Sequence, residues 1–198
     1  MNEALPQVYL VRHGETAWTI SGQHTGRTDI PLTERGEDDA RELSARLRGL
    51  SFAKVFTSPL QRARRTGELA GFGESAEADP DPDLMEWDYG AYEGRRTLDI
   101  RAERPGWRLF EDGCPDGETL VEVSRRADRV IARIRALESD VLVFAHRDIL
   151  RILSARWVAL PALEARRLYL ATASVSTLGY DHGLDEPVIR QLNNGRHS

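Results

Sequence analysis

The sequence predicts an α/β fold with three layers, in which helices flank a mostly parallel central sheet. Three short apolar runs, at residues 8–11, 55–57 and 141–145, are typical of strands that are buried on both faces. Amphipathic helical patterns alternate with these runs, as they do in parallel sheets with helical connections. The 198 residues suffice for one domain of this kind, so a single domain over residues 1–198 is expected.

Local signals give the bounds of the predicted elements. Thr33 is a favourable N-cap for a helix that extends to about residue 50. Ser58, followed by Pro59, marks the start of the next helix. The remaining helices are predicted at residues 118–137 and 149–158, the closing strands at residues 168–171, 176–180 and 188–192, and a loop at residues 74–82.

The composition argues against several classes of protein. The net charge is −5, from 27 basic and 32 acidic residues, so the chain lacks the basic footprint of nucleic-acid-binding proteins. No stretch approaches the ~20 apolar residues of a transmembrane helix, and the first residues lack the pattern of a signal peptide. A cytoplasmic protein without membrane contact is therefore expected. Cys114 is the only cysteine, which excludes an intramolecular disulfide, and no cluster has the ligand spacing of a metal site, so no metal or other cofactor is expected.

Two of the predicted buried strands end in a histidine. Arg12 and His13 follow the first strand, His146 follows the third, and the second strand leads into Ser58. Because the carboxyl ends of parallel strands meet at one edge of the sheet, these side chains are expected to lie together. A helix N-terminus attracts anions, and Arg12 and Arg62 can each bind a phosphate through two N–H groups. Ser58 is expected to cap its helix, although its hydroxyl could also contact a substrate.

These residue types are the ones that phosphoryl transfer needs. A neutral imidazole such as that of His13 can attack phosphorus, and arginines stabilise the charge on the phosphoryl oxygens. A carboxylic acid can protonate the leaving oxygen. Glu86 is the candidate acid, with Asp88 and Glu93 as neighbouring alternatives. The side chains expected at the surface are His24, His182, His197, Arg125 and Arg126.

The chain resembles the histidine phosphatase superfamily, which also contains the cofactor-dependent phosphoglycerate mutases. The resemblance rests on LVRHGET at residues 10–16, TGRTD at 25–29, PLT at 31–33, TSPLQRA at 57–63, EWDYGAYEG at 86–94, DGCPDGET at 112–119 and FAH at 144–146. These segments cover essentially the whole chain in order. The details are most similar to a branch of small phosphatases that includes sedoheptulose-bisphosphatase-like and mycobacterial acid-phosphatase-like proteins. The resemblance implies a phosphoglycerate mutase-like fold.

The resemblance also implies roles for individual residues. His13 matches the nucleophile that becomes phosphohistidine, and Glu86 matches the proton donor. The phosphate pocket is matched by Arg12, Arg62 and His146, and the substrate contacts of the mutases by Thr25, Gly26 and Tyr89.

The chain departs from the family pattern at two positions. Thr19 stands where the family often has asparagine, and its hydroxyl can still donate to a phosphoryl oxygen. Arg147 stands where the family usually has glycine. The Arg147 side chain either reaches over the mouth of the site, where it would favour a substrate with a second anionic group, or pairs with Asp148 or Glu86.

The function predicted from the sequence is hydrolysis of a phosphate monoester of a small metabolite, such as a sugar phosphate or bisphosphate. One alternative is a phosphoglycerate mutase, although the short stretch between Glu86 and His146 has no room for the long insertion of the mutases. The other alternative is an inactive module that binds a phosphorylated ligand, which the presence of all five inner residues disfavours. The sequence leaves open the physiological substrate and the oligomeric state, with a homodimer as one alternative.

Overall fold

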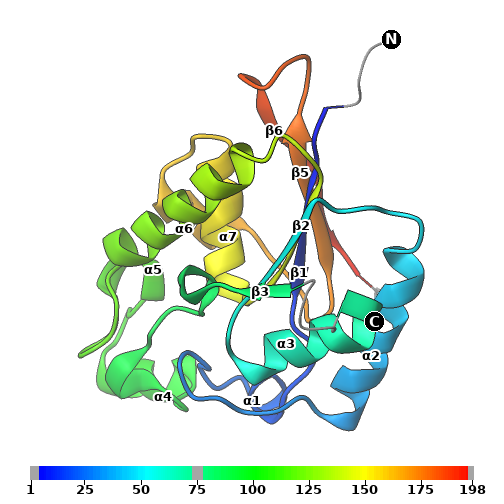
Figure 1. Cartoon of the computed structure of the whole chain (residues 1–198). Coiled ribbons are helices and arrows are strands. Elements are labelled where there is room, and N and C mark those ends of the chain that lie inside the picture. The colour runs from blue at the N-terminus through cyan, green and yellow to red at the C-terminus, as the bar shows by residue number, and fades with distance from the viewer. Residues whose placement is uncertain (1–4, 73–77, 196–198) are drawn as a thin grey trace.

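The computed structural model describes residues 5–72 and 78–195 and has a six-stranded mixed sheet at its centre (Figure 1). The strand order is β3-β2-β4-β1-β5-β6. The strands are β1 (Val8–Arg12), β2 (Lys54–Thr57), β3 (Ala78–Pro80), β4 (Val141–Ala145), β5 (Val175–Tyr180) and β6 (Pro187–Asn194). The first four pair in parallel, while β5 and β6 add an antiparallel edge. The predicted α/β class with a mostly parallel sheet is confirmed.

Helices cover both faces of the sheet (Figure 1). The α-helices are α1 (Ala17–Ser21), α2 (Glu34–Arg46), α3 (Gln61–Gly67), α4 (Thr97–Glu103), α5 (Leu109–Asp112), α6 (Leu120–Arg135) and α7 (Arg147–Trp157). A π-helical turn at Glu68–Phe72 follows α3, and 3-10 turns lie at Pro82–Leu84, Gly90–Tyr92 and Ala162–Arg167. Among the described residues, no helix has both the length and the apolar character needed to cross a membrane.

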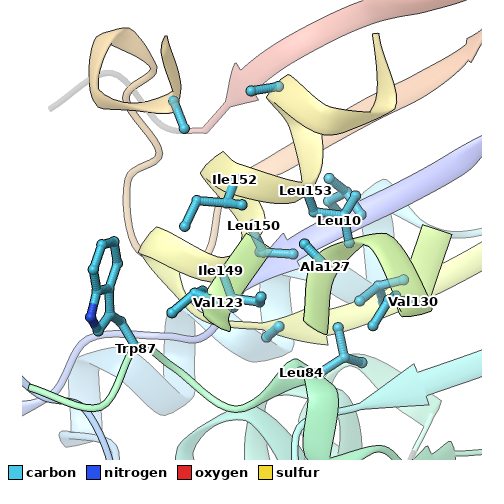
Figure 2. Close-up of a cluster of buried hydrophobic side chains, with 14 of the residues drawn as sticks. Leu10, Leu84, Trp87, Val123, Ala127, Val130, Ile149, Leu150, Ile152 and Leu153 are labelled. Carbon is cyan, nitrogen blue, oxygen red and sulfur yellow. The ribbon is translucent and has the colours of Figure 1, made fainter. Parts of the chain in front are cut away.

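The packing of strand β4 on both faces of the sheet explains why its sequence is apolar throughout. Val141, Val143 and Ala145 pack into the cluster formed with α6 and α7, part of which is shown in Figure 2. Leu142 and Phe144 point to the opposite face and pack into the cluster that includes α2. Successive side chains of a strand alternate between faces, so a strand covered on both sides needs apolar residues at every position.

Two of the predicted elements are wrong. Residues 168–171 form no strand; they follow a 3-10 turn, with Tyr169 68% exposed beside a buried Leu170. The apolar pattern of residues 168–171 therefore reflects one buried side chain, Leu170, in an irregular segment. The predicted loop at residues 74–82 contains β3, which pairs in parallel with β2, while residues 73–77 lie outside the described part of the chain. Proline is tolerated there because β3 is an edge strand.

Helix α6 contains a residue that was wrongly expected at the surface. Arg126 is 8% exposed and lies on the buried side of the helix. Its Nη1 donates to the carbonyl oxygens of Asp83 and Met85 at 2.7 and 2.8 Å, and its Nη2 donates to Glu118 at 2.7 Å. Arg126 thus fixes the segment that leads directly into Glu86.

The parallel strands bring their carboxyl ends to one edge of the sheet. Arg12 at the end of β1 is in register with Ala145 of β4, and Thr57 of β2 is in register with Phe144. The residues that follow these strand ends include His13, Ser58 and His146. The register of the parallel strands therefore brings together the residues that the sequence analysis identified as candidate site residues.

Candidate active site

A cleft of about 680 Å³ lies at this edge of the sheet. Of the predicted site residues, its wall contains Arg12, His13, Thr19, Thr25, Glu86, Tyr89 and Arg147. Ser58, Arg62 and His146 are fully buried directly behind this wall, and Gly26 is also outside the lining. The structure therefore divides the predicted site residues into those that line the cleft and a supporting layer behind them.

His13 has one ring nitrogen engaged and one available. Its Nδ1 lies 2.7 Å from the carbonyl oxygen of Gly14, so Nδ1 carries the proton and donates it there. Burial, followed by the positive charges of Arg62 and Arg12, holds the pKa of His13 well below its usual value of 6.5. The ring is therefore neutral, with the lone pair on Nε2, which is the form that can attack an electrophile.

Arg12 has an unsatisfied donor beside His13. Its Nη1 donates to the carbonyl oxygen of Leu170 at 2.7 Å. Its Nε is the one buried side-chain polar atom of the described residues without a hydrogen-bond partner. Burial lowers the pKa of Arg12 to about 10, and the group remains a cation at neutral pH. A buried donor without a partner costs ~1–3 kcal/mol, which indicates a position prepared for an anionic ligand.

Glu86 is held at the N-terminus of α7. Its Oε1 accepts hydrogen bonds from the backbone N–H groups of Trp87, Asp148 and Ile149 at 3.0–3.1 Å, while Oε2 accepts from Asp148 at 3.1 Å. Burial and the adjacent Asp148 carboxylate raise the pKa of Glu86, outweighing these backbone N–H groups. Glu86 therefore tends to keep a proton, and Oε2, with fewer donors around it, is the oxygen better able to carry it.

The two alternative acids have structural partners outside the cleft lining. Asp88 accepts a hydrogen bond from the Gly90 N–H at 2.9 Å. Glu93 accepts from the backbone N–H groups of residues 26, 27 and 28 and from the Thr28 hydroxyl. Glu93 thereby closes the loop that begins at Thr25. Of the three carboxyl groups considered from the sequence, only Glu86 lines the cleft.

Arg62 and His146 form a buried pair. Arg62 Nε donates to His146 Nδ1 at 3.1 Å, and its two Nη atoms donate to the carbonyl oxygens of residues 25, 26 and 28. Since Nδ1 accepts, His146 Nε2 carries the proton and donates to Ser58 Oγ at 2.7 Å. Burial and the Arg62 charge hold the pKa of His146 well below 6.5. Its ring centroid lies 5.2 Å from that of His13.

Ser58 is not the cap of α3, contrary to the prediction. The helix begins at Gln61, and its N-cap is Leu60, which has no capping side chain. The Ser58 hydroxyl contacts His146 instead and accepts from the Leu60 N–H at 3.3 Å. Pro59 and Leu60 displace the helix start along the chain, so the serine sits too early to cap it.

Three further predicted residues have local roles in the structure. The Thr19 hydroxyl donates to the Thr16 carbonyl oxygen at 2.8 Å and accepts the Thr16 N–H, which closes the first turn of α1. Thr25 lines the cleft at the start of the loop that Glu93 holds. Gly26 allows this loop to pack closely, because a Cβ there would lie 2.4 Å from the Trp87 carbonyl oxygen.

The sequence analysis considered Asp148 only as one alternative partner of Arg147 and missed the larger charged network that Asp148 forms beside the cleft. Asp148 is fully buried and accepts from the Tyr89 hydroxyl at 2.5 Å, from Arg151 Nη1 at 2.6 Å and from the Arg147 guanidinium at 3.2 and 3.3 Å. Its pKa is lowered by the charges of Arg147 and Arg151, against the effect of burial. The position of Asp148 in the first turn of a helix gave no signal of the contacts with Tyr89 and Arg151, because acidic residues are common at helix N-termini.

The prediction that His24 lies at the surface is also wrong. His24 is 8% exposed, with its ring centroid 4.7 Å from that of Tyr89 and its Nε2 3.2 Å from the Thr97 hydroxyl. Burial and the Arg147 charge lower its pKa to about 4. The expectation for His182 is confirmed, since its side chain is 79% exposed, and His197 lies outside the described residues.

Comparison with known proteins identifies the family. The sequence profile of the histidine phosphatase superfamily (branch 1) matches residues 8–195. An acid phosphatase from Mycobacterium tuberculosis is 40% identical over 94% of this chain and 90% of its own. Sedoheptulose 1,7-bisphosphatase from Saccharomyces cerevisiae is 38% identical over 81% of this chain and 70% of its own. A probable phosphoglycerate mutase, GpmB, from Cronobacter sakazakii is 37% identical over 88% of this chain and 85% of its own.

The solved structure of an open reading frame product from Mycobacterium tuberculosis matches with a TM-score of 0.89 and 37% identity over 97% of this chain and 99% of that chain. This chain belongs to the histidine phosphatase superfamily.

Proposed function

We propose that this enzyme hydrolyses phosphate monoesters of small metabolites through a phosphohistidine at His13. The observation that carries the proposal is the neutral His13 ring, with Nε2 available, in a cleft that also holds the unpaired Nε of Arg12. Glu86 completes the set with a carboxyl group whose pKa is raised. A nucleophile, a cation for the phosphoryl oxygens and a proton donor are the groups that the reaction needs.

In the first step, His13 Nε2 attacks phosphorus as the ester P–O bond breaks. The leaving oxygen takes the proton of Glu86 and departs as an alcohol. The phosphorylated ring is a cation, which its Nδ1–H bond to the Gly14 carbonyl oxygen stabilises. Arg12 donates to the equatorial phosphoryl oxygens, whose charge must be balanced in the transition state.

In the second step, water attacks phosphorus and the P–N bond breaks. Glu86, now a carboxylate, takes a proton from the water, so His13 and Glu86 return to their initial states and inorganic phosphate leaves. Arg62 and His146 support both steps from behind His13. The positive charge of Arg62 acts on His13, while its hydrogen bonds keep His146 and the 25–28 loop in position.

A mutase would use the same first step and would return the phosphoryl group to an acceptor other than water. The similarity to GpmB, a probable phosphoglycerate mutase, makes this the second candidate. Incubation with 3-phosphoglycerate distinguishes the two. A phosphatase releases inorganic phosphate, whereas a mutase forms 2-phosphoglycerate without net loss of ester phosphate. Interconversion faster than phosphate release would replace the proposal with the mutase.

Activity toward p-nitrophenyl phosphate should survive dialysis against EDTA, and vanadate should inhibit it. Each catalytic requirement is met by a side chain of the cleft, and vanadate resembles the five-coordinate phosphorus of the transition state. Among the described residues, one exposed group has ligand atoms close enough together to hold a metal ion. This group consists of Asp181, His182 and Glu186, and none of these residues lines the cleft. Loss of activity in EDTA with recovery on addition of Mg²⁺ or Zn²⁺ would contradict this mechanism.

Asp148→Asn should move the alkaline limb of the kcat/KM pH profile to lower pH. After burial, the charge of Asp148 is the largest cause that raises the pKa of Glu86. The acid works below the pKa of Glu86 and is lost as pH rises through it, so a lower pKa ends activity earlier. The profile is measured with an alkyl phosphate, for which protonation of the leaving oxygen matters most.

Asp128→Asn is the matched control for this prediction. Asp128 pairs with Arg156 at 2.9 Å on the outer side of α6 and α7, with 44% of its side chain exposed. Its removal changes the net charge equally and should leave the alkaline limb where it is. An unmoved limb in Asp148→Asn, or a limb at higher pH, would show that Asp148 does not set the pKa of Glu86.

A further inference from the structure

Arg147 is a cation in the cleft that the proposed reaction does not use. It is the first residue of α7, and its guanidinium lies against the wall that also contains His13 and Glu86. The side chain is 39% exposed, whereas its partner Asp148 is fully buried. The structure therefore combines the two arrangements considered from the sequence, because the side chain pairs with Asp148 while it lines the cleft.

The pairing with Asp148 fixes Arg147 without neutralising the site. Asp148 already accepts short hydrogen bonds from the Tyr89 hydroxyl and Arg151, while the two from Arg147 are longer, at 3.2 and 3.3 Å. One carboxylate thus faces two guanidinium groups, which leaves a surplus positive charge. Arg147 uses Nε and Nη2 for this contact, and no described residue accepts a hydrogen bond from its Nη1.

The surplus charge lies in the same cleft as His13 and Arg12. The positive charge of Arg147 lowers the pKa values of His13, Arg12 and His24, which lie on different parts of the cleft wall. A volume of about 680 Å³ is within the range of pockets that enclose whole drug-sized molecules. It leaves room for much more than the transferred phosphoryl group.

We propose that Arg147, held in place by Asp148, binds a second anionic group of the substrate, so that this enzyme favours bisphosphates or phosphorylated carboxylic acids over simple monoesters. The proposal rests on the proposed phosphatase function and adds a substrate class to it. Guanidinium binds phosphate and carboxylate through the same fork of N–H donors.

The test compares substrates that differ only in the second anion. Fructose 1,6-bisphosphate is compared with fructose 1-phosphate, and 3-phosphoglycerate with glycerol 3-phosphate. Arg147→Ala should lower the kcat/KM ratio within a pair by roughly 10- to 100-fold, mainly through a higher KM for the member with the second anionic group, as expected for loss of a charge-assisted contact. The pair that responds more strongly identifies the second anion as phosphate or carboxylate. Arg147→Lys keeps the charge without the fork and should restore part of the ratio.

Arg35→Ala is the matched control. Arg35 is an exposed arginine of α2 that also lines the cleft, so its removal changes the net charge of the cleft equally. The ratio should remain near the wild-type value. Equal losses for both members of each pair in Arg147→Ala, or a larger fall of the ratio in Arg35→Ala, would overturn the proposal. Thermal unfolding of each variant verifies that the fold is retained.

A binding experiment separates this proposal from the proposed function. The same compounds are titrated calorimetrically into His13→Ala protein, with and without Arg147→Ala. Selective loss of affinity for the compounds with a second anionic group supports the subsite even if the wild-type enzyme hydrolyses none of the compounds, in which case only the phosphatase function fails. Turnover by the wild type, with no selective loss in either experiment, leaves the phosphatase function intact and rejects the subsite.

Discussion

His13→Ala should lower kcat for phosphate monoesters by ~10³-fold or more, because the substitution removes the nucleophile itself. The Nδ1–H bond to Gly14 leaves Nε2 as the attacking atom. The other histidine that lines the cleft among the described residues, His24, has its Nε2 3.2 Å from the Thr97 hydroxyl. His146 is fully buried with both ring nitrogens engaged. The measurement is release of inorganic phosphate under saturating substrate.

The same experiment should reveal the intermediate in the wild-type protein. Brief exposure to substrate should leave an acid-labile, alkali-stable phosphoryl group on the peptide that contains His13. His182→Ala is the control, since this side chain lies on the exposed β5–β6 turn, away from the cleft lining, and should keep wild-type turnover and labelling. Near-normal turnover in His13→Ala, or a phosphoryl group on another histidine, would contradict a covalent mechanism through His13.

The part of the fold that could be predicted is the part encoded by short-range patterns. β4 is an unbroken apolar run because helices cover both of its faces, and its predicted bounds agree with the structure. The carboxyl-edge rule then brings together His13 and His146 from opposite halves of the chain. Local patterns failed at residues 168–171, where a single buried leucine, Leu170, gives an irregular segment the alternation expected of a strand.

The buried positions of Arg126 and His24 could not be predicted, because the groups that they contact are distant in sequence. Arg126 follows Arg125 in a charged helix, and nothing local shows that it turns inward to hold the segment before Glu86. His24 sits in a polar loop, and its burial depends on aromatic rings supplied by Tyr89 and Trp107. Residue type and spacing identify reactive groups, whereas their orientation comes from contacts that form only in the folded chain.

Glu86→Gln should lower kcat/KM for alkyl phosphates by ~10²–10⁴-fold and affect p-nitrophenyl phosphate much less. Glutamine has the shape of the protonated acid and can still accept the N–H groups at the start of α7, but it cannot release a proton to the leaving oxygen. Nitrophenolate leaves without protonation, so it needs the acid less. The alkaline limb assigned to Glu86 should also disappear from the pH profile for alkyl phosphates.

Glu118→Gln is the matched control for a partly buried carboxyl group with a structural role. Glu118 pairs with Arg126 at 2.7 Å and does not line the cleft. Its substitution should lower thermal stability, because Arg126 loses its charged partner, while the ratio of alkyl to nitrophenyl phosphate hydrolysis stays constant. The leaving-group dependence therefore separates proton donation from a general loss of structure. Equal losses for both substrates in Glu86→Gln would assign Glu86 to the structure of the α7 N-terminus, and the general acid would have to come from another residue of the cleft.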